Sequence, residues 1–242
     1  GVRWPLRPRI LFIAASPDEV PFDEHRRELL NALQPFRMLG PDEQPVLSND
    51  GRREQYGQLL TILKDARFED VVAECAAHRY THVHLLAHGV RDPNSLHASY
   101  GLELGGQAVS AERLASAFAG LTNSGIQRPS VVTLATCDSG NQQDAVLVPG
   151  GSIAHVLHQA GIALVLASQV PLSKEGSVLV VRELYRGLLW AENPWVLMHR
   201  LRTALHGLLG DSSHDWASLV VYEALPRDLA DQLEAARYLQ AK

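Results

Sequence analysis

The sequence contains few of the residues that define several common protein classes. Only Cys75 and Cys137 are present, too few for a disulfide framework and consistent with a reducing compartment where a thiol stays free. Lys and Arg number 22 against 27 Asp and Glu, and a formal charge of −5 argues against direct nucleic-acid binding. No apolar run approaches the length of a membrane span. We therefore expect a soluble, cytoplasmic protein without nucleic-acid or membrane partners, and no cofactor.

Apolar runs typical of buried strands alternate along the chain with stretches of helical periodicity. Predicted strands cover 9–16, 81–87, 130–136, 162–167 and 216–222, with a small hairpin near 100–106. Predicted helices cover 23–33, 53–66, 68–78, 110–119, 152–160, 173–190 and 194–209. This alternation predicts an α/β fold in which helices flank both faces of a mostly parallel sheet.

Nothing in the composition marks a linker, so we expect a single domain over 1–242, with a core at about 9–225 and a helical tail at 226–242. The chain starts at Gly1 rather than methionine. This start is compatible with a domain cut from a longer protein that carries a sensor or regulatory part.

Two of the apolar runs end in short stretches with a reactive side chain. The sequence LLAHG at 85–89 contains His88, and LATCDSG at 134–140 contains Cys137. Ligand sites in open α/β sheets lie beyond the carboxyl ends of the strands, so we predict that these two residues form a base and nucleophile pair. Gly89 has no Cβ, so its N–H can approach a substrate carbonyl closely, and the N–H of Cys137 can complete an oxyanion hole.

Other interpretations of these residues stay open. A lone cysteine is commonly a buried structural thiol, which is how we interpret Cys75 because it follows a helical apolar spacing. His82 and His84 lie an even number of positions from His88, so in a strand all three would point to the same face. These three histidines and Cys137 form a metal-site alternative. We favour that alternative less, because alternating strand histidines are more often half-buried with hydrogen-bonded rings.

Four carboxylates are candidates for binding a basic substrate side chain. Asp138 directly follows the predicted nucleophile, although capping a turn is an equally good explanation for it. Asp144 and Glu103 lie on predicted loops that should border the cleft, and Glu175 opens the long helix at 173–190. The sequence does not favour one of them.

Six stretches in this order resemble the CHAT domain, a caspase-like and separase-like cysteine peptidase domain. They are ILFIAASP at 10–17, HLLAHG at 84–89, LATCDSG at 134–140, AGIALVLA at 160–167, ELYRGL at 183–188 and WASLVVY at 216–222. Cys137 lies 49 positions after His88, and caspases place their histidine about 50 residues before their cysteine. The resemblance covers most of the chain and implies a caspase-like α/β sheet.

The resemblance also implies roles for individual residues. His88 would be the general base, Cys137 the nucleophile, and the amides of Gly89 and Cys137 the oxyanion hole. Resemblance to defence-associated members implies a regulated bacterial defence or cell-death protease with a protein substrate and a regulatory or sensor partner. One departure concerns 168–174, which reads SQVPLSK where relatives often carry a tryptophan and acidic residues. A preference for cleavage after Arg or Lys therefore cannot be transferred.

Three hypotheses of function follow. The first is a cysteine endopeptidase that works through an acyl-enzyme formed on Cys137. The second is a catalytically silent interaction module that kept the fold, against which the intact His-Gly and Cys-x-Ser-Gly pairing argues. The third is a thiol acyltransferase or hydrolase acting on a non-peptide substrate.

Overall fold

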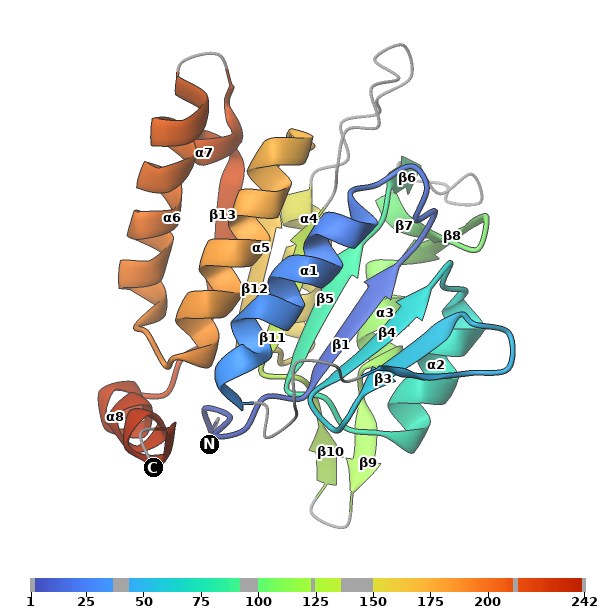
Figure 1. Cartoon of the computed structure of the whole chain (residues 1–242), viewed down its shortest axis with the longest axis horizontal. Coiled ribbons are helices and arrows are strands. Elements are labelled where there is room, and N and C mark those ends of the chain that lie inside the picture. Colours follow the sequence, from blue (N-terminus) through green and yellow to red (C-terminus); the bar gives the residue numbers. More distant parts are fainter. Residues whose placement is uncertain are drawn as a thin grey trace.

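The computed structural model describes residues 3–36, 44–91, 100–122, 125–135, 150–210 and 213–240. Its main sheet contains eight strands in the spatial order β13-β12-β11-β5-β1-β4-β3-β2 (Figure 1). The five strands from β12 to β4 in this order run parallel. The remaining strands, β13 at one edge and β3 and β2 at the other, are antiparallel to their neighbours. The predicted mostly parallel α/β sheet is confirmed.

The strands of the main sheet are short, and the five that were predicted, β1, β5, β11, β12 and β13, end within two residues of the predicted positions. In chain order the strands of this sheet are β1 (Ile10–Ala14), β2 (Val46–Leu47), β3 (Arg53–Tyr56), β4 (Leu60–Lys64), β5 (His82–Leu86), β11 (Val131–Ala135), β12 (Leu164–Ser168) and β13 (Leu219–Glu223). Two smaller sheets accompany it. One contains β6 (Gly89–Arg91), β7 (Tyr100–Leu104) and β8 (Gln107–Ser110), and the other β9 (Gly120–Thr122) and β10 (Gly125–Gln127).

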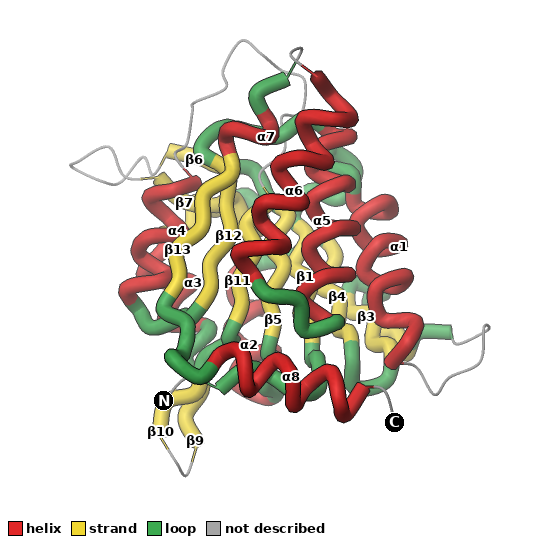
Figure 2. Tube along the Cα trace, turned by 90° about the vertical axis from the view of Figure 1, so that its left-hand side faces the viewer, coloured by secondary structure: helices red, strands yellow, loops and turns green. Residues whose placement is uncertain are grey.

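Helices cover both faces of the main sheet, as predicted. One face carries α1 (Phe22–Leu33), α5 (Lys174–Leu189) and α6 (Pro194–Leu209), and the opposite face carries α2 (Phe68–Ala77), α3 (Ala111–Ala117) and α4 (Gly150–Gln159). Figure 2 shows the strands between α3 and α4 on one side and α1, α5 and α6 on the other. The remaining helical elements are η1 (Gln34–Phe36), α7 (Asp215–Ser218) and α8 (Leu229–Gln240).

The sequence explains where several helices begin. The Ser110 hydroxyl accepts a hydrogen bond from the Arg113 N–H, so the predicted cap of this helix is confirmed. Pro194 occupies the first turn of α6, where its missing N–H leaves no helical bond unmade. The Asn193 side chain accepts from the Trp195 N–H and caps the same helix. Local capping chemistry therefore positions these helix ends.

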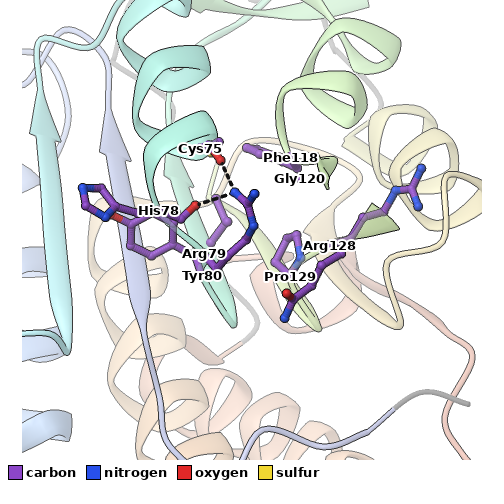
Figure 3. Close-up of a pocket in the computed structure, with 10 residues that line it drawn as sticks. Cys75, His78, Arg79, Tyr80, Phe118, Gly120, Arg128 and Pro129 are labelled. Atoms are coloured by element: carbon purple, nitrogen blue, oxygen red, sulfur yellow. Dashed lines mark hydrogen bonds between the residues drawn. The ribbon is translucent and has the colours of Figure 1, made fainter. Parts of the chain in front are cut away.

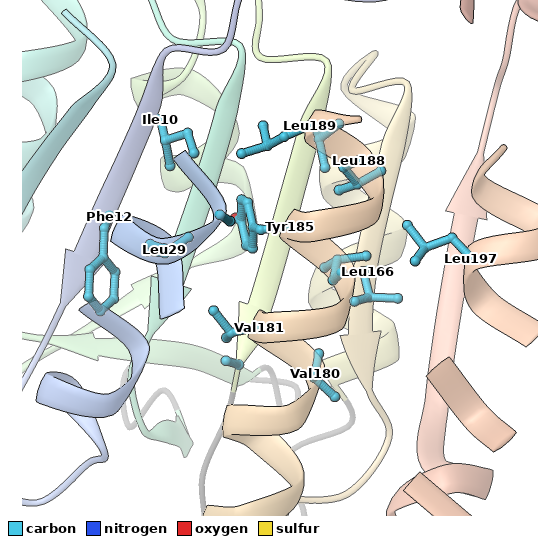
Figure 4. Close-up of a cluster of buried hydrophobic side chains, with 14 of the residues drawn as sticks. Ile10, Phe12, Leu29, Leu166, Val180, Val181, Tyr185, Leu188, Leu189 and Leu197 are labelled. Carbon is cyan, nitrogen blue, oxygen red and sulfur yellow. The ribbon is translucent and has the colours of Figure 1, made fainter. Parts of the chain in front are cut away.

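Successive side chains of β1 point to opposite faces of the sheet and contribute to two apolar cores. Ile10 and Phe12 pack with α1 and α5 on one face, and Leu11 and Ile13 pack on the face of α2, α3 and α4. Figure 4 shows the first of these cores, in which Phe12 lies near α1 and Tyr185 projects from α5 toward the sheet. Because a central strand is buried on both faces, its sequence is apolar at every position.

One predicted element is wrong in type, and another begins later than predicted. The stretch 53–66 is not a helix but the antiparallel hairpin of β3 and β4, which turns at Gly57 with φ of 54°. Its apolar positions fit a helical period equally well, and the pairing of β4 with β1 decides in favour of strands. The predicted strand at 216–222 begins as α7, and only Leu219–Glu223 pairs with β12. The predicted tail helix is confirmed as α8.

Among the described residues, no helix is both long and apolar enough to cross a membrane.

Candidate functional site

His88 lies two positions beyond the carboxyl end of β5 and directly before β6. Figure 1 shows β6 near the carboxyl ends of the central strands. Its carbonyl accepts a hydrogen bond of 2.9 Å from the Glu103 N–H, and Gly89 pairs with Leu102 in the small sheet of β6 and β7. The His88 side chain is only 16 % exposed. The backbone of the predicted base and of the predicted oxyanion donor is therefore held by contacts with β7.

The strand that precedes the predicted nucleophile is the direct neighbour of β5. β11 and β5 are parallel, and their register places Ala135 beside Leu86. The carboxyl ends of the two strands therefore meet at one edge of the sheet, as the sequence predicts. Cys137, Asp138 and Asp144 lie outside the described residues, so their roles remain predictions.

An unpredicted carboxylate contacts the predicted base. The Nε2 atom of His88 lies 3.3 Å from Oε2 of Glu19, a residue in the turn between β1 and α1. The same Nε2 is shielded from solvent and makes no aligned hydrogen bond within the described part of the chain. Sequence reasoning missed Glu19, although its place after the end of a central strand is a usable signal for a ligand-site residue.

The other two predicted substrate-binding residues, Glu103 and Glu175, lie within the described part of the chain. Glu103 is half-buried on β7, where its backbone rather than its carboxylate contacts His88. Glu175 is exposed in the first turn of α5. Within the described ranges, neither carboxylate forms an ion pair with His88.

An aspartate from α7 contacts the connection between β12 and α5. Asp215 of α7 is 5 % exposed and accepts hydrogen bonds from the Ser173 N–H at 3.2 Å and the Ser173 hydroxyl at 2.5 Å. Ser173 in turn caps α5 by accepting from the Gly176 N–H. Asp215 therefore fixes the start of α5, and no local sequence pattern predicts this contact.

The metal-site alternative finds no support where the structure describes the chain. The rings of His82 and His84 are buried, and Nε2 of His84 lies 3.0 Å from Nδ1 of His25, whose Nε2 contacts Ser177 Oγ at 3.2 Å. Burial lowers the pKa of His25 to about 3 and that of His82 to about 4. No group of three or more metal-ligating side chains occurs among the described residues. His82 and His84 are neutral core histidines.

Cys75 is a core thiol, as predicted. It is 7 % exposed, and burial raises its pKa to about 12, which suppresses the reactive thiolate. Figure 3 shows it beside a small pocket where Arg79 donates hydrogen bonds to the carbonyl oxygens of Cys75 and His78. This pocket also contacts Tyr80, which precedes β5, and so lies away from His88 at the other end of that strand.

The family model of the CHAT domain matches residues 7–224. The chain belongs to the CHAT domain family. Members of the CHAT family are typically related to caspase-like peptidases, and the sheet described above is consistent with a caspase-like fold. The match confirms the family resemblance drawn from the six sequence stretches. Comparison with curated proteins finds no match.

Proposed function

We propose that this CHAT domain is a cysteine endopeptidase with His88 as general base and Cys137 as nucleophile. The observation that carries the proposal is the parallel register of β5 and β11, which brings the end of β11 beside the strand that precedes His88. Cys137 follows the last residue of β11 by two positions in the sequence, which supports its proposed pairing with His88. The family match supports peptidase chemistry.

The proposed reaction proceeds through an acyl-enzyme. The imidazole of His88 takes the thiol proton of Cys137, and the sulfur attacks the carbonyl carbon of a peptide bond. The N–H groups of Gly89 and Cys137 donate to the oxyanion that forms. The imidazolium then returns its proton to the leaving amine as the C–N bond breaks. Water, deprotonated by the same imidazole, hydrolyses the thioester and releases the free carboxylate.

The wider biological setting is proposed on the family resemblance alone. It comprises a protein substrate, a regulatory or sensor partner, and a role in bacterial defence or cell death. Asp138, Asp144, Glu103 and Glu175 stay candidates for binding a basic substrate side chain.

Digestion of a peptide library by the wild type and a Cys137→Ala variant tests the proposal. We expect the variant to lose cleavage at least a thousandfold, since the sulfur forms the covalent intermediate. Cys75→Ala is the matched control, because this thiol is buried and lies away from His88; we expect it to keep cleavage. Mass spectrometry of the products reads out the bond that is cut.

Undiminished cleavage by Cys137→Ala would contradict the proposal. Absence of cleavage by the wild type, together with no labelling of Cys137 by an electrophilic peptide, would instead support an interaction module. Labelling of Cys137 without peptide cleavage would favour a thiol acyltransferase or a hydrolase of non-peptide substrates.

A further inference from the structure

We propose that Glu19 is a positioning residue for His88: its carboxylate accepts the Nε2–H of the ring and leaves Nδ1 as the nitrogen that takes the thiol proton. The catalytic part of this inference rests on the proposed function, in which His88 is the base. The contact between the two side chains is a property of the fold and can be tested separately.

The backbone around Glu19 is fixed on both sides. The Ala15 N–H donates to the Leu86 carbonyl at 3.0 Å, which ties the end of β1 to the end of β5 just before His88. Ser16 then adopts a φ of 47°, an uncommon value for a residue other than glycine, and its carbonyl accepts from the Glu19 N–H at 2.9 Å. Val20, which follows, is buried. A strained turn with an anchored residue at each end therefore directs Glu19 toward His88.

The chemistry of imidazole explains what this contact does. A neutral histidine ring has one N–H donor and one acceptor nitrogen, and a hydrogen bond to one nitrogen sets the role of the other. An ionised carboxylate only accepts hydrogen bonds, so its place beside Nε2 favours the proton on that atom. Nδ1 then carries the free lone pair. The carboxylate also stabilises the imidazolium formed when the thiol gives up its proton.

The solvent exposure of Glu19 and His88 determines how strongly the carboxylate acts on the ring. The Nε2 atom is shielded from solvent, whereas the Glu19 side chain is 65 % exposed, so water screens the carboxylate charge. The separation of 3.3 Å is an ion-pair distance but not an aligned hydrogen bond. Catalytic hydrogen bonds are often long before substrate binds and tighten afterwards. We therefore expect the contact to act chiefly on the tautomer of His88.

The first test is nuclear magnetic resonance of the 242-residue chain with ¹⁵N-labelled histidine, with His88 assigned by comparison with His88→Gln. In a Cys137→Ala background, which removes the thiol, we expect neutral His88 to carry its proton on Nε2. In Glu19→Gln, part of the neutral ring should move its proton to Nδ1, because the carboxylate that can only accept a hydrogen bond is lost. Asp18→Asn, an exposed neighbour in the same turn, should leave the tautomer unchanged.

The second test is the rate at which the chain cleaves a peptide library at fixed pH. Glu19→Gln should lower the rate by about tenfold, Glu19→Asp should restore part of it, and Asp18→Asn should leave it unchanged. Thermal unfolding of each variant checks that the fold is kept. A His88 proton on Nδ1 in the parent, or the same tautomer ratio in Glu19→Gln and its parent, would overturn the inference.

Failure of this inference differs from failure of the proposed function. If Glu19→Gln cleaves as fast as wild type while His88→Ala is inactive, the peptidase stands and Glu19 has no positioning role. If His88→Ala cleaves as fast as wild type, the proposed function fails, and the inference fails with it because the ring would have no thiol proton to take. If the wild type cleaves no peptide, the magnetic resonance measurement alone decides whether Glu19 sets the tautomer of His88.

Discussion

At the scale of single residues, the site depends on contacts between positions that are far apart in the sequence. Glu19 reaches His88, and Asp215 reaches Ser173 across 42 positions. His88 itself is predictable, because a histidine followed by glycine at the end of an apolar run is a local pattern. Neither Glu19 nor Asp215 has such a pattern. Their roles depend on which strand and helix ends meet in space.

The contact between Asp215 and the start of α5 gives a prediction about Gly176. An added Cβ at this position would lie 1.9 Å from Oδ2 of Asp215, which is too close for any real contact. We expect Gly176→Ala to lower the free energy of unfolding by about 1 to 3 kcal/mol, since the aspartate must move from Ser173. Urea unfolding followed by circular dichroism measures the change.

Gly207 provides the matched control for Gly176. It also lies inside a helix, α6, but an added Cβ there meets nothing within 4 Å. Gly207→Ala should therefore stabilise the protein by about 0.5 to 1 kcal/mol through helix propensity alone. Equal effects of the two substitutions would show that the Asp215 contact does not constrain Gly176.

At the scale of elements, the sequence predicts continuous apolar strands and long amphipathic helices well. β1, β5, β11, β12, α5 and α6 lie where their patterns place them. The sequence analysis predicts a helix in place of the hairpin of β3 and β4, because the apolar positions of this stretch fit the spacing of a helix as well as that of a strand. A strand at that place becomes favourable only when β4 can pair with β1, and this pairing is a tertiary interaction.

α8 illustrates how a charged segment can still belong to the core. Leu229, Leu233 and Ala236 are buried on one side of this helix, and Arg237 donates two hydrogen bonds to the Ala191 carbonyl. We expect Leu233→Ala to cost about 2 to 4 kcal/mol of stability by leaving a cavity. Leu239→Ala, at a position 54 % exposed on the same helix, should change stability by less than about 0.5 kcal/mol. Similar losses from both variants would contradict docking through Leu233.

At the scale of the whole molecule, buried histidines make stability depend on pH. Burial lowers the pKa of His25, His82 and His84, and like-charge repulsion from His25 adds to the effect on His84. The unfolded chain binds protons on these rings below about pH 6.5, whereas the folded chain does not, so stability is complete above that pH and falls below it. Between pH 6 and 5 each histidine should contribute a loss approaching about 1.4 kcal/mol per pH unit.

Urea unfolding at a series of pH values between 7.5 and 5 measures this dependence. His25→Gln should make the slope shallower, because one of the three rings no longer titrates in the unfolded chain. His199→Gln, at an exposed position on α6, should leave the slope as in the wild type. A flat profile between pH 6.5 and 5 would contradict neutral burial of these rings.

The sequence by itself determined the α/β class, the mostly parallel sheet and the family, because strands buried on both faces must be apolar throughout. It also yields the prediction that His88 and Cys137 form a pair, because ligand-site residues follow the carboxyl ends of parallel strands. Only the tertiary structure decided that Glu19 lies beside His88, that Asp215 holds the start of α5, and that 53–66 forms strands. Those outcomes depend on which distant backbone segments pair, and local patterns do not encode that choice.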